Sequence, residues 1–285
     1  MKLNFTKMQG CGNDFIFIDC LTADAPNISP QQIQALCDRH FGIGADGLVM
    51  ILPSSTGNAD ARMRMYNPDG SDGGMCGNAI RCIAKYLLES GTTDKTTMDI
   101  ETNSGVCAIT AGLENGRVVS AKVDMGLPRL MPSDIPVLLQ GDEVEVVGHS
   151  VHVGGKEYSI TCVSMGNPHA VVFCEAIDDL PLAEIGPLFE HNALFPERVN
   201  TEFVQILGRN HLKMRVWERG AGETLACGTG ASAAAVAAVL NNHCDMGADI
   251  KIELLGGELI INYTEGRTVY MTGGCEKVFE GAIEI

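Results

Sequence analysis

Short stretches in which apolar and polar residues alternate recur along most of the chain. A period of two places successive side chains on opposite faces of an extended backbone, so these stretches predict strands. They lie at 1–7, 14–19, 61–66, 116–123, 158–163, 170–173 and 211–217, and 257–263 with 267–271 predicts a late hairpin closed by a glycine turn.

Three segments carry helix signals instead. Ser29 and Pro30 supply an N-cap and a first turn for a helix that continues through 31–38. Residues 77–89 place their apolar side chains on one helical face, with a glycine after the last turn. Residues 229–240 are mostly alanine and have no polar face, so this helix is expected to be buried.

An internal repeat connects the two halves of the chain. The stretch 63–66 precedes Cys76-Gly77, and the similar stretch 214–217 precedes Cys227-Gly228, at a constant offset of 151 residues (227 − 76). Each copy is predicted to consist of a strand, a polar glycine-rich loop, the Cys-Gly pair and a helix. We therefore expect two similar α+β domains from a duplication, 1–126 carrying Cys76 and 127–273 carrying Cys227, with a linker near 126–129.

Composition narrows the class of protein. The chain has 285 residues, 45% hydrophobic, and its formal net charge of −16 disfavours binding to nucleic acid or to anionic membranes. The apolar stretches are too short to span a membrane, and the first residues have no signal-peptide core. Eleven cysteines, an odd number without a Cys-x-x-Cys pair, predict reduced thiols in the cytoplasm rather than disulfides or structural zinc.

A cysteine at the start of a helix is suited to chemistry. The helix N-terminus favours the thiolate and so lowers the thiol pKa from about 8.5. The first backbone N–H groups, on Gly77 and Asn78 in one copy and Gly228 and Thr229 in the other, form a site for an anion. Two such helix starts facing each other could hold one carboxylate, remove a proton from one face of its α-carbon and return a proton to the other face.

The remaining cysteines are expected to be structural. A buried small apolar role is predicted for all but one of them: Cys20, Cys37, Cys82, Cys107, Cys162, Cys174, Cys244 and Cys275. Cys11 lies in a glycine-rich turn, where it could line a site without reacting.

At the two cysteine motifs, and over nearly the whole chain, the sequence closely resembles the diaminopimelate epimerase family. The similar motifs are Gly12-Asn13-Asp14-Phe15, 39–47, 67–71, Gly166-Asn167-Pro168-His169, 198–203 and 217–220. Several separate motifs in the right order are more specific than either cysteine motif alone.

The resemblance implies an isomerase of lysine and cell-wall precursor biosynthesis that interconverts LL- and meso-2,6-diaminopimelate without pyridoxal phosphate, metal or nucleotide. It implies two domains, each a curved, mixed but mostly antiparallel sheet around a central helix, with the site in the cleft between them. Residues 274–285 would return to the first domain. A homodimer is implied by analogy.

The family also implies roles for particular residues. Cys76 and Cys227 would be the acid/base pair, and Gly77, Asn78, Gly228 and Thr229 would hold the reacting carboxylate. Glu218 and Arg219 would meet the reacting amino group, and Arg219 would also reach the distal carboxylate. The distal end would be recognised by four asparagines, Asn13, Asn67, Asn167 and Asn200.

Asp72 and His169 resemble residues that orient the first cysteine, as Glu218 does the second. Asp72 could instead be a turn residue, and His169 could make a capping or core hydrogen bond. Two positions depart from the family pattern: many members have histidine in the motif in which this chain has Gln9-Gly10-Cys11, and some have glutamine where Gly47 stands.

Other classes stay open. A proline or hydroxyproline epimerase shares the two-thiol logic, but a proline pocket would not need asparagines and an arginine for a second charged end. A thiol redox protein could join Cys76 and Cys227 in a disulfide. A non-catalytic amino-acid binding module would need the carboxylate site but not both sulfurs. A pyridoxal enzyme is formally open, although no phosphate-binding loop indicates one.

Overall fold

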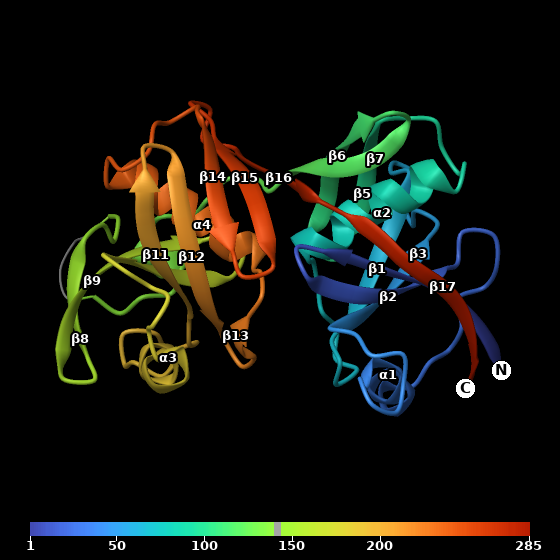
Figure 1. Cartoon of the computed structure of the whole chain (residues 1–285), viewed down its shortest axis with the longest axis horizontal. Helices are drawn as coiled ribbons and strands as arrows, with labels where there is room; N and C mark the ends of the chain where they lie inside the picture. Colours follow the sequence, from blue (N-terminus) through green and yellow to red (C-terminus); the bar gives the residue numbers. More distant parts are fainter. Residues whose placement is uncertain (140–143) are drawn as a thin grey trace. The chain divides into compact units, whose positions relative to one another are not determined.

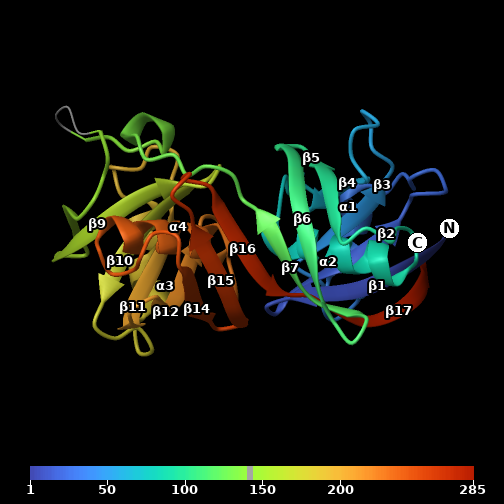
Figure 2. The ribbon, with the colours of Figure 1, turned by 90° about the horizontal axis from the view of Figure 1, so that it is seen from above.

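The computed structural model describes residues 1–139 and 144–285, which divide into two compact units. Unit 1 comprises Met1–Asp124 together with Thr272–Ile285, and unit 2 comprises Met125–Met271. Figures 1 and 2 show the elements of each unit from two directions.

Unit 1 is a mixed sheet wrapped around one helix. Its strands are β1 (Lys2–Gly10), β2 (Asn13–Asp19), β3 (Gly47–Leu52), β4 (Ala61–Tyr66), β5 (Thr97–Thr102), β6 (Gly105–Glu114), β7 (Arg117–Asp124) and β17 (Glu276–Glu284), and its helices are α1 (Pro30–Cys37) and α2 (Gly77–Glu89). The sheet runs β17-β1-β2-β3-β4-β5-β6-β7, with β2–β3 and β4–β5 parallel and the other pairs antiparallel.

The two helices of unit 1 pack on different elements. Helix α2 contacts β1, β2, β6, β7 and β17 (Figure 1). Ile80, Ile83 and Leu87 of its apolar stripe are buried. Helix α1 contacts β3 and packs Ile33 and Leu36 against Ile16 and Leu48 of the sheet. It begins with a complete capping box, because Ser29 and Gln32 bond each other's backbone N–H groups.

Unit 2 repeats this plan. Its strands are β8 (His149–Val153), β9 (Lys156–Ser164), β10 (Pro168–Cys174), β11 (Asn200–Gly208), β12 (His211–Glu218), β13 (Gly222–Thr224), β14 (Asp249–Leu254), β15 (Gly257–Tyr263) and β16 (Val269–Gly274), whose last residues belong to unit 1; its helices are η1 (Pro132–Asp134, a 3₁₀ turn), α3 (Leu182–Glu190) and α4 (Gly228–Leu240). The strands pair as β8-β9-β10-β11-β12-β14-β15, with β10–β11 and β12–β14 parallel.

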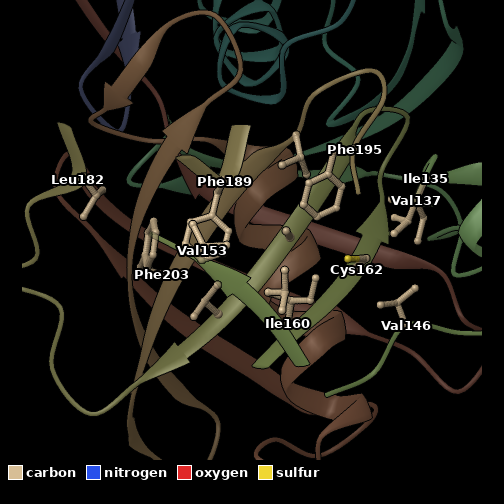
Figure 3. Close-up of a cluster of buried hydrophobic side chains, with 14 of the residues drawn as sticks. Ile135, Val137, Val146, Val153, Ile160, Cys162, Leu182, Phe189, Phe195 and Phe203 are labelled. Atoms are coloured by element: carbon tan, nitrogen blue, oxygen red, sulfur yellow. The ribbon is translucent and has the colours of Figure 1, made fainter. Parts of the chain in front are cut away.

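Helices α3 and α4 both pack against strands of unit 2. Phe189 of α3 packs edge-on against Phe203 of β11 and belongs to a cluster of buried side chains that includes Ile160 and Val153 (Figure 3). On the other side, α4 contacts β9, β10, β11, β14 and β15. Its alanines are fully buried, and their small side chains let the strands approach closely.

The two units share one order of elements. The run β1-β2-β3-β4-β5-β6 in unit 1 and the run β9-β10-β11-β12-β14-β15 in unit 2 have the same sequence of parallel and antiparallel pairs. Helices α2 and α4 each have 13 residues and each begin directly after the cysteine of the motif. The predicted fold, two similar α+β halves with a central helix, is confirmed.

The expected linker at 126–129 lies beside the boundary between the two units, which falls between Asp124 and Met125. It is bonded to unit 2, because Arg129 exchanges two backbone hydrogen bonds with Ser164 of β9 and Gly126 accepts one from Val269. Helix α3 was not predicted. Within the described residues, no helix combines the length and the apolarity that crossing a membrane requires.

Candidate active site

Cys76 is the N-cap residue of α2 and forms the centre of a polar group in unit 1. Its extended backbone (φ −127°, ψ 119°) turns the chain into the helix, and its side chain is half-buried. The thiol donates to Asn13 Oδ1 at 3.7 Å, and Asn78 Nδ2 donates to the same oxygen at 3.0 Å. The structure therefore brings together three of the predicted residues around one amide, with Gly77 buried in the first helical turn.

Charged residues that were not among the predicted site residues fix the amide of Asn13. Its Nδ2 donates to Asp46 Oδ2 at 2.7 Å, and Arg39 bridges Asp46 and Asp14 with two contacts of 2.6 Å. Burial would raise the pKa of Asp14, but hydrogen bonds from Arg39 and Lys7 outweigh it and bring the pKa to about 2. The available signal was the motif 39–47, which contains both Arg39 and Asp46.

Asn67 and Asp72 lie in the loop between β4 and α2. Their side chains form hydrogen bonds within that loop and with Asn103, in the loop between β5 and β6. Asn67 Nδ2 donates to Ser71 Oγ at 3.0 Å. Asp72 accepts from the backbone N–H of Gly74 at 2.8 Å and from the amide of Asn103 at 2.9 and 3.0 Å. These bonds are those of a turn residue, the alternative interpretation of Asp72, and its expected role in orienting Cys76 stays a prediction.

Cys11 is buried at a left-handed position between β1 and β2 (φ 54°). Arg81, fully buried in α2, donates to Cys11 Sγ at 3.6 Å and to the carbonyl oxygen of Gly77 at 3.1 Å. Burial raises the pKa of Cys11 despite the charge of Arg81, so this thiol is expected to stay protonated.

Cys227 is the N-cap residue of α4 and is buried in unit 2. The backbone N–H of Gly230 donates to its sulfur at 3.4 Å, and Thr229 Oγ1 lies 3.4 Å from the same sulfur. Gly228 is buried in the first turn of the helix, whose N–H groups are directed toward the same end.

Burial, together with two nearby carboxylates, favours the protonated form of Cys227. Burial, then the charges of Glu218 and Glu202, raise its pKa well above the ordinary value, so the helix-start lowering expected from sequence does not prevail. Burial also raises the pKa of Glu218, against hydrogen bonds from Thr224 and from the Cys227 thiol. In this arrangement Cys227 is a protonated thiol with an acceptor beside it.

His169 is fully buried on β10. Its Nδ1 lies 2.7 Å from Oε1 of Glu202, which is also fully buried on β11, and its Nε2 lies 2.9 Å from Asn167 Oδ1. Asn167 Nδ2 in turn donates to Thr229 Oγ1 at 3.3 Å. Within unit 2 the contacts of His169 lead through Asn167 and Thr229 toward Cys227. Its expected role at the first cysteine, Cys76 of unit 1, stays a prediction.

Glu202 was missed by the sequence analysis. The available signal was the motif 198–203, which contains Glu202. A carboxylate buried within a strand costs free energy unless a partner compensates for it.

Asn200 and Arg219 stabilise the loop after β12. Asn200 Nδ2 donates to the carbonyl oxygen of Pro168 at 2.8 Å, and the backbone N–H of Arg219 donates to Asn200 Oδ1 at 2.9 Å. The Arg219 guanidinium is exposed and donates to the carbonyl oxygen of Glu197 at 2.9 Å. Both ends of the Asn200 amide are therefore used within the protein.

The other cysteines are mostly buried, as expected, but Cys107 and Cys174 are only half-buried. Burial raises the thiol pKa of all eight, namely Cys20, Cys37, Cys82, Cys107, Cys162, Cys174, Cys244 and Cys275. In residues 1–139 and 144–285, three or more His, Cys, Asp or Glu side chains nowhere gather closely enough to hold a metal ion.

The fold has counterparts among solved structures. It matches a probable proline racemase from Agrobacterium radiobacter with a TM-score of 0.71 at 15% identity, covering 99% of this chain and 92% of that one. It also matches a PhzF-family phenazine biosynthesis protein of Bacillus anthracis with a TM-score of 0.67 at 16% identity, covering both chains completely. These likenesses are of fold.

Sequence gives the family. The sequence model of the diaminopimelate epimerase family matches residues 5–131 and 161–278 of the chain. The diaminopimelate epimerases of Desulfovibrio desulfuricans and Acetivibrio thermocellus are 52% and 50% identical to this chain, each over 99% of it and over 98% and 99% of their own length. The chain belongs to the diaminopimelate epimerase family, and the predicted isomerase class is confirmed.

Proposed function

We propose that this protein interconverts LL- and meso-2,6-diaminopimelate, with Cys76 and Cys227 acting on opposite faces of one α-carbon and without a cofactor. The observation that carries the proposal is the repeated geometry: each unit delivers one cysteine as the N-cap of a central 13-residue helix. Membership of the family supports the substrate.

The two thiols differ in their surroundings, and this difference supports different protonation states. The raised pKa of Cys227 supports its action as the acid that delivers a proton, with Glu218 as the adjacent acceptor when the direction reverses. Cys76 would then be the base in that direction, and the two roles would exchange in the other. The half-buried sulfur of Cys76 and its bond to Asn13 suit an exchange with substrate.

The remaining predicted contacts belong to this proposal. The first N–H groups of α2 and α4, on Gly77, Asn78, Gly228 and Thr229, would hold the reacting carboxylate and stabilise the charge that develops on it. Glu218 and Arg219 would meet the reacting amino group, and the asparagines, Asn13, Asn67, Asn167 and Asn200, would recognise the distal end. A homodimer in the cytoplasm is part of the proposal and can be tested by sedimentation and cell fractionation.

The test uses LL-diaminopimelate in deuterated water with the pure protein, after removal of metals and under reducing conditions. We expect meso product with deuterium at the α-carbon and no exchange with proline. Cys76→Ala and Cys227→Ala should each abolish epimerisation, whereas Cys107→Ala and Cys174→Ala, which remove half-buried thiols from the same two units, should retain it.

Other outcomes would select other functions. Exchange with proline and none with diaminopimelate would favour the proline racemase class that shares the fold. Activity that survives either active-site substitution would reject the two-base mechanism. A reversible disulfide without any carbon–hydrogen exchange would indicate a redox protein.

A further inference from the structure

One buried carboxylate, that of Glu190, bonds the residues on both sides of Glu218 and Arg219. Glu190 is the last residue of α3 and is buried. Its Oε2 accepts from the indole Nε1 of Trp217 at 2.8 Å, and its Oε1 accepts from the backbone N–H of Gly220 at 3.0 Å. Trp217 and Gly220 directly flank the two residues that the proposed function assigns to the reacting amino group.

The donors fix the direction of these bonds. An indole N–H and a backbone N–H can only donate, and so can the guanidinium of Arg198, whose Nη1 lies 3.5 Å from Oε1 of Glu190. Glu190 is therefore the acceptor for all three groups. A glutamine in its place has one oxygen and one NH₂ group, so it can accept from Trp217 or from Gly220 but not from each with a separate oxygen.

The loop that Glu190 bonds is a tight turn. It joins the end of β12 to the start of β13, and the backbone N–H of Ala221 donates to the carbonyl oxygen of Glu218 at 3.1 Å. Gly220 has a positive φ of 78°, which favours glycine. Because the turn is so short, a displacement of Gly220 also displaces Glu218 and Arg219.

Helix α3 is shaped to receive the indole of Trp217. The helix contacts β11, β12 and β13 (Figure 1). A Cβ at Gly186 would lie 2.3 Å from Trp217 Cδ2, so glycine lets the ring reach the helix, and one turn later Glu190 meets the indole N–H. Packing of the ring does not require a carboxylate, whose burial costs free energy. What Glu190 adds is the connection between the indole and Gly220.

We propose that Glu190 is a positioning residue, which holds Trp217 and Gly220 and thereby fixes Glu218 and Arg219 in the orientation that binds the reacting amino group of the substrate. This role rests on the proposed function, in which Glu218 and Arg219 meet that amino group. Glu190 acts through the loop and from the end of a helix that carries none of the predicted site residues.

The first test follows the two N–H groups directly. Trp217 is the single tryptophan of the chain, so its indole N–H gives one signal in a ¹⁵N NMR spectrum. Glu190→Gln should accelerate the solvent exchange of the indole N–H or of the Gly220 N–H about tenfold, because one of them loses its acceptor. In the parent protein, LL-diaminopimelate should shift both signals. Unchanged exchange of both groups in the variant would overturn the proposal.

The second test separates positioning from stability. Glu190→Gln should raise the KM for LL-diaminopimelate about three- to tenfold, with a smaller loss of kcat, when both are measured per folded protein. Glu190→Asp keeps the charge but is too short to reach both donors, and it should show the same KM effect if the glutamine variant does not fold. A role in stability alone would lower the free energy of unfolding and leave KM unchanged, and that result would overturn the proposal.

Glu184→Gln is the matched control for these measurements. Glu184 is an exposed glutamate in the first turn of the same helix. Its replacement should leave KM, kcat and both exchange rates unchanged. Equal changes in the Glu184 and Glu190 variants would overturn the proposal, because they would show a general effect of charge on α3.

The third test is a rescue. Trp217→Phe keeps an aromatic ring against Gly186 but removes the indole N–H, so a glutamine at 190 can turn its NH₂ group to that side and keep its oxygen for Gly220. Glu190→Gln should therefore raise KM less in the Trp217→Phe background than in the parent protein, by about threefold or more. Equal factors in the two backgrounds would overturn the proposal.

The outcomes distinguish this proposal from the proposed function. Absence of epimerisation by the parent protein would contradict the proposed function. The exchange of the Gly220 N–H in the Glu190 variants then decides whether Glu190 fixes the loop.

Discussion

Gly230 lies between the carboxylate of Glu202 and the sulfur of Cys227, and its missing side chain makes their proximity possible. A Cβ there would lie 2.7 Å from Glu202 Oε1 and 3.3 Å from Cys227 Sγ. Both groups are buried, and Glu202 is fixed by its bond to His169. The first turn of α4 therefore has no room for a side chain at this position.

Gly230→Ala should lower the free energy of unfolding by about 1–3 kcal/mol, because the added methyl group must displace a fixed carboxylate or the helix start. Urea denaturation measures the change. Gly208→Ala, at the end of β11, is the matched control, because a Cβ there meets nothing within 4 Å. Equal losses in the two variants would show that steric exclusion at Gly230 is not the cause.

Glu218 illustrates how a group of the site can reduce stability. Burial raises its pKa, so ionised Glu218 disfavours the folded state at neutral pH, and this cost disappears once the pH falls below the pKa of the unfolded chain. Glu218→Gln should therefore raise the free energy of unfolding at neutral pH, and the gain should vanish in acid. The same variant should lose most epimerase activity.

Urea denaturation at several pH values measures this prediction. Glu223→Gln is the control of opposite sign, because Glu223 accepts two hydrogen bonds from Arg215, at 2.7 and 3.0 Å. That variant should be less stable at neutral pH. A Glu218→Gln variant that is destabilised at neutral pH would contradict the expected sign.

At the scale of the elements, α4 shows how close packing limits the size of its side chains. Its residues from Gly230 to Ala238 are buried, and strands of unit 2 contact it from several sides. Ala234→Leu should cost about 1–3 kcal/mol of unfolding free energy or more, because the close-packed strands must move apart. Val239→Leu, near the half-buried end of the same helix, should cost less. Similar costs at both positions would indicate that α4 is loosely packed.

An element could be predicted when the signals for it lie within its own sequence. Helix α2 begins and ends as predicted at 77–89, because its stripe and flanking glycines are local signals. Helix α3 was not predicted because Pro187 lies inside it, and a proline usually ends a helix. Strand β6 escaped because most of its side chains are exposed or half-buried, which removes the alternation.

The residues of the site also divide into those with a local sequence signal and those without one. Cys76 and Cys227 could be found because a repeated motif marks them. Asp46 and Glu202 could not be assigned, because their partners, Asn13 and His169, are 33 residues away in sequence in each case and meet them only through strand pairing. The single turn around Asp72 was visible locally, but its bond to Asn103 depends on the folded sheet.

At the scale of the whole molecule, the chain builds the two units differently: unit 2 is a continuous stretch, whereas unit 1 is completed by the last strand of the chain. β17 pairs with β1 from Lys2 to Gln9. A fragment of residues 125–271 should therefore fold and unfold cooperatively, but a fragment of residues 1–124 should not, because β1 lacks its outer partner.

Circular dichroism and urea denaturation of the two fragments test this expectation. Joining 272–285 to the end of 1–124 by a glycine-serine linker should restore cooperative unfolding to unit 1. Equal stability of 1–124 with and without the added strand would show that β17 is dispensable.

The returning strand β17 also affects the order in which the two units can fold during synthesis. A ribosome delivers β1 among the first residues and β17 among the last, so the earlier half must wait, with Leu3 and Phe5 uncovered, while the whole of the later half is synthesised. The half translated second can thus reach its final state first. During that interval the nascent chain has an open sheet edge, and this is the moment at which a chaperone would protect it most.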